Sequence, residues 1–106
     1  MTFTYPIAGI RTTNSDAGQH IANRVNFIGS HLIGQVMSPN GVDASSTSYG
    51  MLPAPFIDLL VKDQPSYIVW SYGTPIAWFG NMEWRIPAFK YSQTTSRHQS
   101  IVRRAI

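Results

Sequence analysis

The chain has 106 residues and no cysteine, which excludes disulfides, thiolate zinc sites and a thiol nucleophile. Charged residues make up 12% and hydrophobic residues 43%, with a formal net charge of +3, so the composition is not that of a disordered chain. The length predicts a single domain over residues 1–106. Because sparsely charged surfaces tend to expose apolar patches, we also expect a homo-oligomer.

The first third of the chain contains patterns typical of strands and patterns typical of helices. Residues 2–10 are typical of a strand, which a proline interrupts or confines to a sheet edge. A short polar side chain near Asp16 can cap a helix over about 16–24. We expect a strand over about 26–36, although the apolar residues there also recur at helical spacing.

A long irregular segment is predicted at about 37–55, where proline, glycine, serine and threonine are concentrated. A stretch of that length without secondary structure is usually functional, mobile or part of an interface. Residues 56–61 are apolar and predict a short helical turn, which Pro65 terminates.

The clearest pattern is a three-stranded meander over about 67–86. Aromatic and β-branched residues predict strands at 67–72, 76–79 and 83–86, with a tight hairpin at Gly80. Alternation in the last strand places Trp84 and Arg85 on opposite faces, and one face of the meander is expected to be apolar. The residues expected to be largely buried are Trp70, Ile76, Trp84 and Ile101.

The carboxyl-terminal residues predict an amphipathic helix over about 96–105, so the fold class is α+β, with this helix against a small antiparallel sheet. Ser96 and Gln99 match the capping box, in which the two side chains bond each other's backbone amides. One face of the helix is apolar, and the other carries its arginines.

Three segments of the chain resemble a module of small phage and bacterial proteins. They are SYGTPIAW at 71–78, YSQTTSRHQ at 91–99 and RVNFIGSHLIG at 24–34. The similarity covers roughly residues 24–34 and 67–106. It implies a shared fold and a phage or bacterial origin, and it supplies no catalytic residue because no activity is established for such proteins. With no signal peptide or membrane-spanning stretch in the sequence, we expect a cytoplasmic protein, in the host cell if a phage encodes it.

The sequence gives little support for catalysis or for a metal site. His20, His31 and His98 lack the spacings of zinc ligands, and we expect His98 to be a partly buried helix residue bonded to the meander. A pairing of Ser96 with His98 conflicts with the capping role of Ser96. We therefore expect no enzyme activity, no cofactor and no metal.

Basic residues gather at the carboxyl end, where residues 84–106 contain five and no acid. Arginines neutralise phosphates, and the hydroxyls at the predicted helix start suit an anion, so a nucleic-acid partner is our first hypothesis. The alternatives are a protein-binding accessory factor, with a host protein as partner, and a structural component of an oligomer. The candidate anion-binding residues are Arg85, Lys90, Thr95, Arg97, Arg103 and Arg104.

Overall fold

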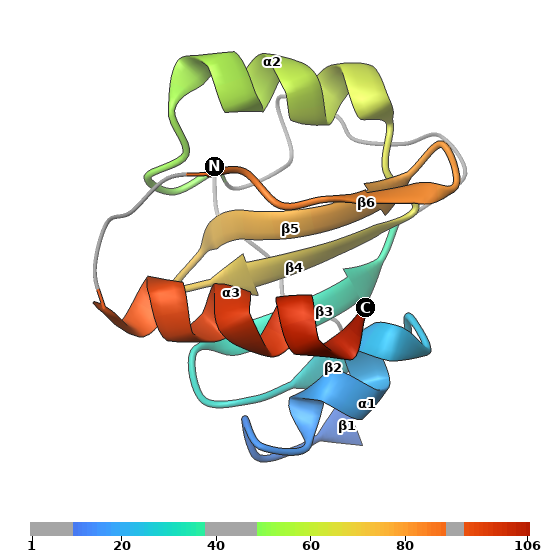
Figure 1. The fold of residues 1–106 in the computed structure, drawn as a ribbon, viewed down its shortest axis with the longest axis vertical. Coiled ribbons are helices and arrows are strands. Elements are labelled where there is room, and N and C mark those ends of the chain that lie inside the picture. The colour runs from blue at the N-terminus through green and yellow to red at the C-terminus, as the bar shows by residue number, and fades with distance from the viewer. Residues whose placement is uncertain (1–9, 38–48, 89–92) are drawn as a thin grey trace.

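A computed structural model describes residues 10–37, 49–88 and 93–106, and shows a mixed α+β fold of three layers (Figure 1). Six strands form one sheet in chain order, with β1 parallel to β2 and all other neighbours antiparallel. Helices α1 and α3 cover one face and α2 covers the other. The elements are β1 (Ile10–Arg11), α1 (Ala17–Ala22), β2 (Phe27–Ile28), β3 (Leu32–Val36), α2 (Ala54–Asp63), β4 (Tyr67–Ser71), β5 (Thr74–Gly80), β6 (Glu83–Arg85) and α3 (Gln93–Ala105).

The core is divided between the two faces of the sheet. Strand β4 is buried along its whole length, with Tyr67 and Val69 in the cluster beneath α1 and α3, and Ile68 and Trp70 in the cluster beneath α2. The meander has the expected apolar face beneath α1 and α3, and its opposite face is apolar as well because α2 covers it. This double coverage explains why the strand is apolar at consecutive positions rather than at alternate ones.

The predicted meander is confirmed as β4, β5 and β6, paired in order and antiparallel. A β-bulge lies where Val69 pairs with Ala77 while Trp70 pairs with Pro75, which leaves Ile76 as the additional residue. Ile76 and Ala77 consequently both join the cluster beneath α1 and α3.

The predicted burial is confirmed in part. Trp70 and Ile76 are buried, whereas Trp84 and Ile101 are half-buried and pack at the margin of the core.

The strand predicted over 26–36 is a hairpin of two strands, β2 and β3. The chain reverses between them at Gly29 to His31, and His31 adopts a left-handed backbone conformation with φ 59°. The helix predicted over 16–24 is present as the shorter α1, and of the strand predicted over 2–10 only Ile10 lies among the described residues.

Helix α2 is longer than the turn predicted at 56–61. It begins at Ala54, directly after Pro53, and ends where Gln64 takes a left-handed conformation with φ 46°, one residue before Pro65. The irregular segment therefore ends at residue 53 instead of 55. Its residues 38–48 lie outside the described part of the chain.

Helix α3 begins at Gln93, so the predicted capping box at Ser96 was wrong. Ser96 lies in the helix, and its carbonyl oxygen accepts a hydrogen bond from the Ser100 hydroxyl at 3.1 Å. The Gln99 amide instead donates to the carbonyl oxygens of Pro87 at 2.9 Å and Ile76 at 3.4 Å. Gln99 thus joins α3 to the meander.

Candidate functional site

The exposed side of α3 carries three arginines around a surface cavity of about 540 Å³, lined by Arg97, Ser100, Arg103 and Arg104. We call these four residues the arginine face. Among the described residues, one ion pair is present, between Arg85 and Asp63. The three arginines of α3 therefore have no described carboxylate partner. Within the ranges that the structure describes, the positive charge of this face is therefore not paired with a carboxylate.

The arginine face is a consequence of how α3 packs. Val102 on the opposite side of the helix is fully buried, and His98 and Gln99 are nearly so. Arg103 and Arg104 occupy the last turn, where cations interact favourably with the helix dipole. The amphipathic pattern of α3 predicted this orientation correctly.

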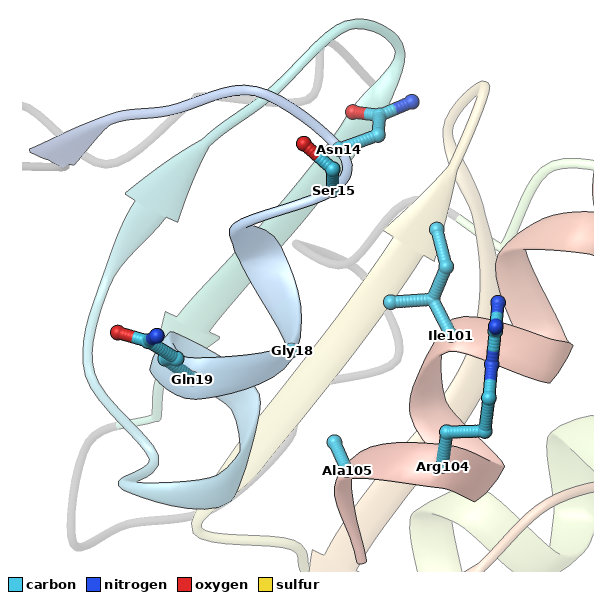
Figure 2. Close-up of a pocket in the computed structure, with 7 residues that line it drawn as sticks. All are labelled: Asn14, Ser15, Gly18, Gln19, Ile101, Arg104 and Ala105. Atoms are coloured by element: carbon cyan, nitrogen blue, oxygen red, sulfur yellow. The ribbon is translucent and has the colours of Figure 1, made fainter.

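A second cavity, of about 600 Å³, lies between α1 and α3 (Figure 2). Gly18 of α1 leaves its wall open, since a β-carbon there would first meet Ala105 at 3.7 Å. Arg104 lines both cavities, so the positive charge of the arginine face reaches the rim of this one. The other lining residues are Asn14, Ser15, Gln19 and Ile101.

Three side chains form a polar chain beneath α3. The Ser71 hydroxyl lies 2.6 Å from His98 Nδ1, and the Asn14 amide nitrogen lies 3.3 Å from His98 Nε2. Asn14 is oriented by Ser30, whose N–H donates to its Oδ1 and whose carbonyl oxygen accepts from its Nδ2. Since the amide nitrogen donates to Nε2, the neutral imidazole carries its proton on Nδ1 and donates to the hydroxyl oxygen of Ser71.

The environment of His98 favours this neutral form. The residue is 4% exposed, and burial lowers the pKa of His98 below its usual value, with the nearby His31 lowering this pKa further. Ser71 is only 1% exposed, so no substrate reaches its hydroxyl in this conformation. The hydrogen bond between Ser71 and His98 joins β4 to α3. It confirms the expectation that His98 is bonded to the meander.

Sequence reasoning considered Ser96 as the partner of His98, and the structure identifies Ser71 instead. Ser71 and His98 are 27 positions apart, and their spacing in the sequence does not indicate that they are in contact. Ser71 opens the segment at 71–78, and His98 lies in the segment at 91–99. Two of the three segments that carry the family resemblance therefore meet at this hydrogen bond.

Of the remaining predicted site residues, Arg85 does not join the arginine face. Arg85 Nε donates to Asp63 Oδ2 at 2.6 Å on the face of the sheet that α2 covers, and Trp78 Nε1 donates to the same oxygen at 2.8 Å. Although burial by itself raises the pKa of Asp63, the two hydrogen bonds and the positive charges of Arg85 and Lys62 together outweigh it and hold that pKa below its usual value. Lys90 and the side chain of Thr95 lie outside the described part of the chain.

Within residues 10–37, 49–88 and 93–106, no group of three or more His, Cys, Asp or Glu side chains is placed to hold a metal ion. In the same ranges, no helix has the length and apolar character needed to cross a membrane.

The model of DUF8033, a family of unknown function, matches residues 16–102 of the chain. This range includes the Ser71–His98 contact and Arg97, while Arg103 and Arg104 lie beyond its end. No curated protein and no solved structure matches the chain.

Proposed function

We propose a non-catalytic role for this chain, which belongs to DUF8033, a family of unknown function. In this role the arginine face binds the phosphates of nucleic acid. The observation that carries this proposal is the set of three exposed arginines that line one surface cavity with no described carboxylate beside them. An accessory protein of phage type, acting in the cytoplasm, fits such a role.

The arginines are spread along α3, so they can contact more than one phosphate. Arg97 and Arg104 are seven residues apart on α3, which corresponds to about 10 Å along the helix axis. The planar guanidinium group binds phosphate oxygens in a bidentate manner. The arginine face contains no asparagine or glutamine to read base edges, so we expect binding with little sequence preference.

A non-catalytic role is supported by the polar chain under α3. Its serine hydroxyl and its imidazole, the groups best suited to nucleophilic chemistry, are both buried and bonded to each other. The role of a protein-binding or structural component remains the alternative, and the same experiment distinguishes it.

The test is a fluorescence anisotropy titration of labelled duplex and single-stranded oligonucleotides at salt concentrations from about 50 to 200 mM. Three phosphate contacts predict a slope of log affinity against log salt of about −2.7 for duplex. Replacing all three arginines of the face by glutamine should abolish most of that slope. The charge-matched control replaces three exposed cations elsewhere, Arg11, Arg24 and Lys62, by glutamine and should retain most of the binding.

Two outcomes contradict the proposal. One is the absence of binding at low salt, which favours the protein-binding alternative. The other is an equal loss of affinity in the arginine-face variant and its charge-matched control, which indicates attraction by net charge alone.

We further propose that the protein self-associates. Exposed apolar side chains support this proposal: Met82 is 91% exposed, Met51 70% and Val36 50%. Such side chains favour burial between subunits. Light scattering at tens of micromolar should give a mass above the 11.8 kDa of one chain, and a mass equal to that value would rule out self-association under those conditions.

A further inference from the structure

Two turns at one end of the sheet present a stacked pair of aromatic rings. The rings of His31, from the β2–β3 turn, and Tyr72, from the β4–β5 turn, are nearly parallel, with centroids 4.3 Å apart and an interplanar angle of 10°. The backbone N–H of Tyr72 donates to the carbonyl oxygen of His31 at 2.9 Å, so the two turns are also joined through the main chain. Both residues are exposed, and Tyr72 is 58% exposed.

The backbone at this ring pair is unusual. Tyr72 and Gly73 form the two-residue loop between paired Ser71 and Thr74, with φ values of 52° and 78°. Loops of this kind favour asparagine, aspartate or glycine at the first position, and a bulky residue with positive φ is an outlier. His31 has a positive φ as well, at 59°.

The fold gains little burial from the Tyr72 ring, because more than half of the residue is exposed. Contacts with the rings of His31 and His98 account for the covered part of Tyr72, and more than half of this residue at a strained position is left exposed. Strained residues of this type concentrate at functional sites, where the surrounding structure holds them in place.

The Tyr72 ring of this pair lies near α3. The ring of Tyr72 has its centroid 6.2 Å from that of His98, and His98 directly follows Arg97 in α3. His98 is itself held on both ring nitrogens by Ser71 and Asn14. The Tyr72 ring thus lies near a rigidly held side chain of α3, one position along that helix from Arg97.

We propose that the stacked His31–Tyr72 pair is a platform on which an unpaired base stacks while the arginine face holds the adjoining phosphates. This inference rests on the proposed function, and it specifies single-stranded nucleic acid as the preferred ligand. Positively charged surfaces combined with exposed aromatic rings bind single strands in this way, since every base has a face that stacks. A duplex offers phosphates to the arginines but keeps its bases paired.

The test compares a single-stranded oligonucleotide with a duplex of the same sequence in three variants of the full chain. Tyr72→Phe keeps the ring and should leave both affinities unchanged. Tyr72→Leu and Tyr72→Gly should lower the single-strand affinity by about 5- to 100-fold, as expected for loss of one base–aromatic stack. Tyr72→Leu and Tyr72→Gly should each change the affinity for the duplex by less than about twofold.

Thermal unfolding of the same variants separates binding from structure. Tyr72→Gly should unfold at the same temperature as the wild type or higher, because glycine adopts the positive φ without strain. That result together with lost single-strand binding supports the platform. Lower stability accompanied by equal loss of both affinities overturns it, because the ring then has a structural role.

The two proposals fail in different ways. If single strand and duplex bind equally and Tyr72→Leu changes neither affinity, the platform is wrong while phosphate binding by the arginine face stands. If neither oligonucleotide binds the wild type at low salt, the proposed function is wrong and the platform with it.

Discussion

Protonation of His98 should destabilise the fold as the pH falls below about 6.5. The side chain is 4% exposed, its two ring nitrogens are bonded to Ser71 and Asn14, and burial lowers the pKa of His98 in the folded state. The unfolded chain has no such constraint and takes up a proton near pH 6.5. Between the two pKa values the unfolded state binds more protons, so the free energy of unfolding is largest above pH 6.5 and decreases as the pH falls.

The magnitude follows from the environment. Of the groups around the ring, Ser71 and Asn14 are neutral, and His31 opposes a positive charge at this position. No described carboxylate pairs with His98 to stabilise its charged form. The loss of stability between pH 7.5 and 5.5 is at most about 1.4 kcal/mol, the limit set by proton uptake in the unfolded state alone.

The assay is urea denaturation at several pH values between 7.5 and 5.5, at one protein concentration so that any self-association contributes equally. His98→Gln should be less stable than the wild type at pH 7.5, because it disturbs the polar chain, but its stability should decrease less than that of the wild type as the pH falls to 5.5. His20→Gln, which removes a histidine outside the polar chain, serves as the control. A His98→Gln variant with the full wild-type dependence on pH would refute the reasoning.

Three further substitutions should change stability in ways that calorimetry or urea denaturation measures. Gly18→Ala should stabilise the fold by up to about 1 kcal/mol, because α1 gains a better helix former and the new methyl meets its nearest neighbour at 3.7 Å; a loss would contradict the open wall of the cavity. Gly34→Ala should destabilise the fold by several kcal/mol, since a β-carbon there overlaps the Tyr67 hydroxyl and the ring of Phe27. An unchanged stability would show that the neighbours of β3 can move to accommodate a methyl group. Asp63→Ala should cost about 1–3 kcal/mol, because the indole N–H of the buried Trp78 loses its acceptor; an unchanged midpoint would remove any structural role for this carboxylate.

The elements that sequence reasoning predicted well are those whose signal is local. The meander combines aromatic and β-branched runs with short turns, and the arginine face follows from the amphipathic period of α3. The hairpin at β2 and β3 was missed because its reversal uses His31 at a positive φ, a conformation that sequence patterns associate with glycine and asparagine. The start of α3 was misplaced because Ser96 and Gln99 match a capping pattern that the helix does not use.

Contacts between distant segments could not be predicted. The bond between Ser71 and His98 depends on how α3 lies across β4, and the pairing of Asp63 with Arg85 depends on α2 covering the other face. Arg85 consequently looked like a member of the basic surface, because its nearest acid in the sequence is Glu83 while its partner lies 22 residues away. Such contacts are tertiary consequences of the layer arrangement.

The neighbouring residues His98 and Gln99 determine the rotation of α3 about its own axis. A helix held only by aliphatic side chains is less sharply oriented about its axis, since the hydrophobic effect is non-directional. Here the imidazole is directed at the Ser71 hydroxyl, and the adjacent amide is directed at the carbonyl oxygen of Pro87. Hydrogen bonds weaken steeply away from linear geometry, so two of them from adjacent positions admit one angular setting of the helix. The direction in which Arg97 and Arg104 point is therefore determined on the buried side of α3.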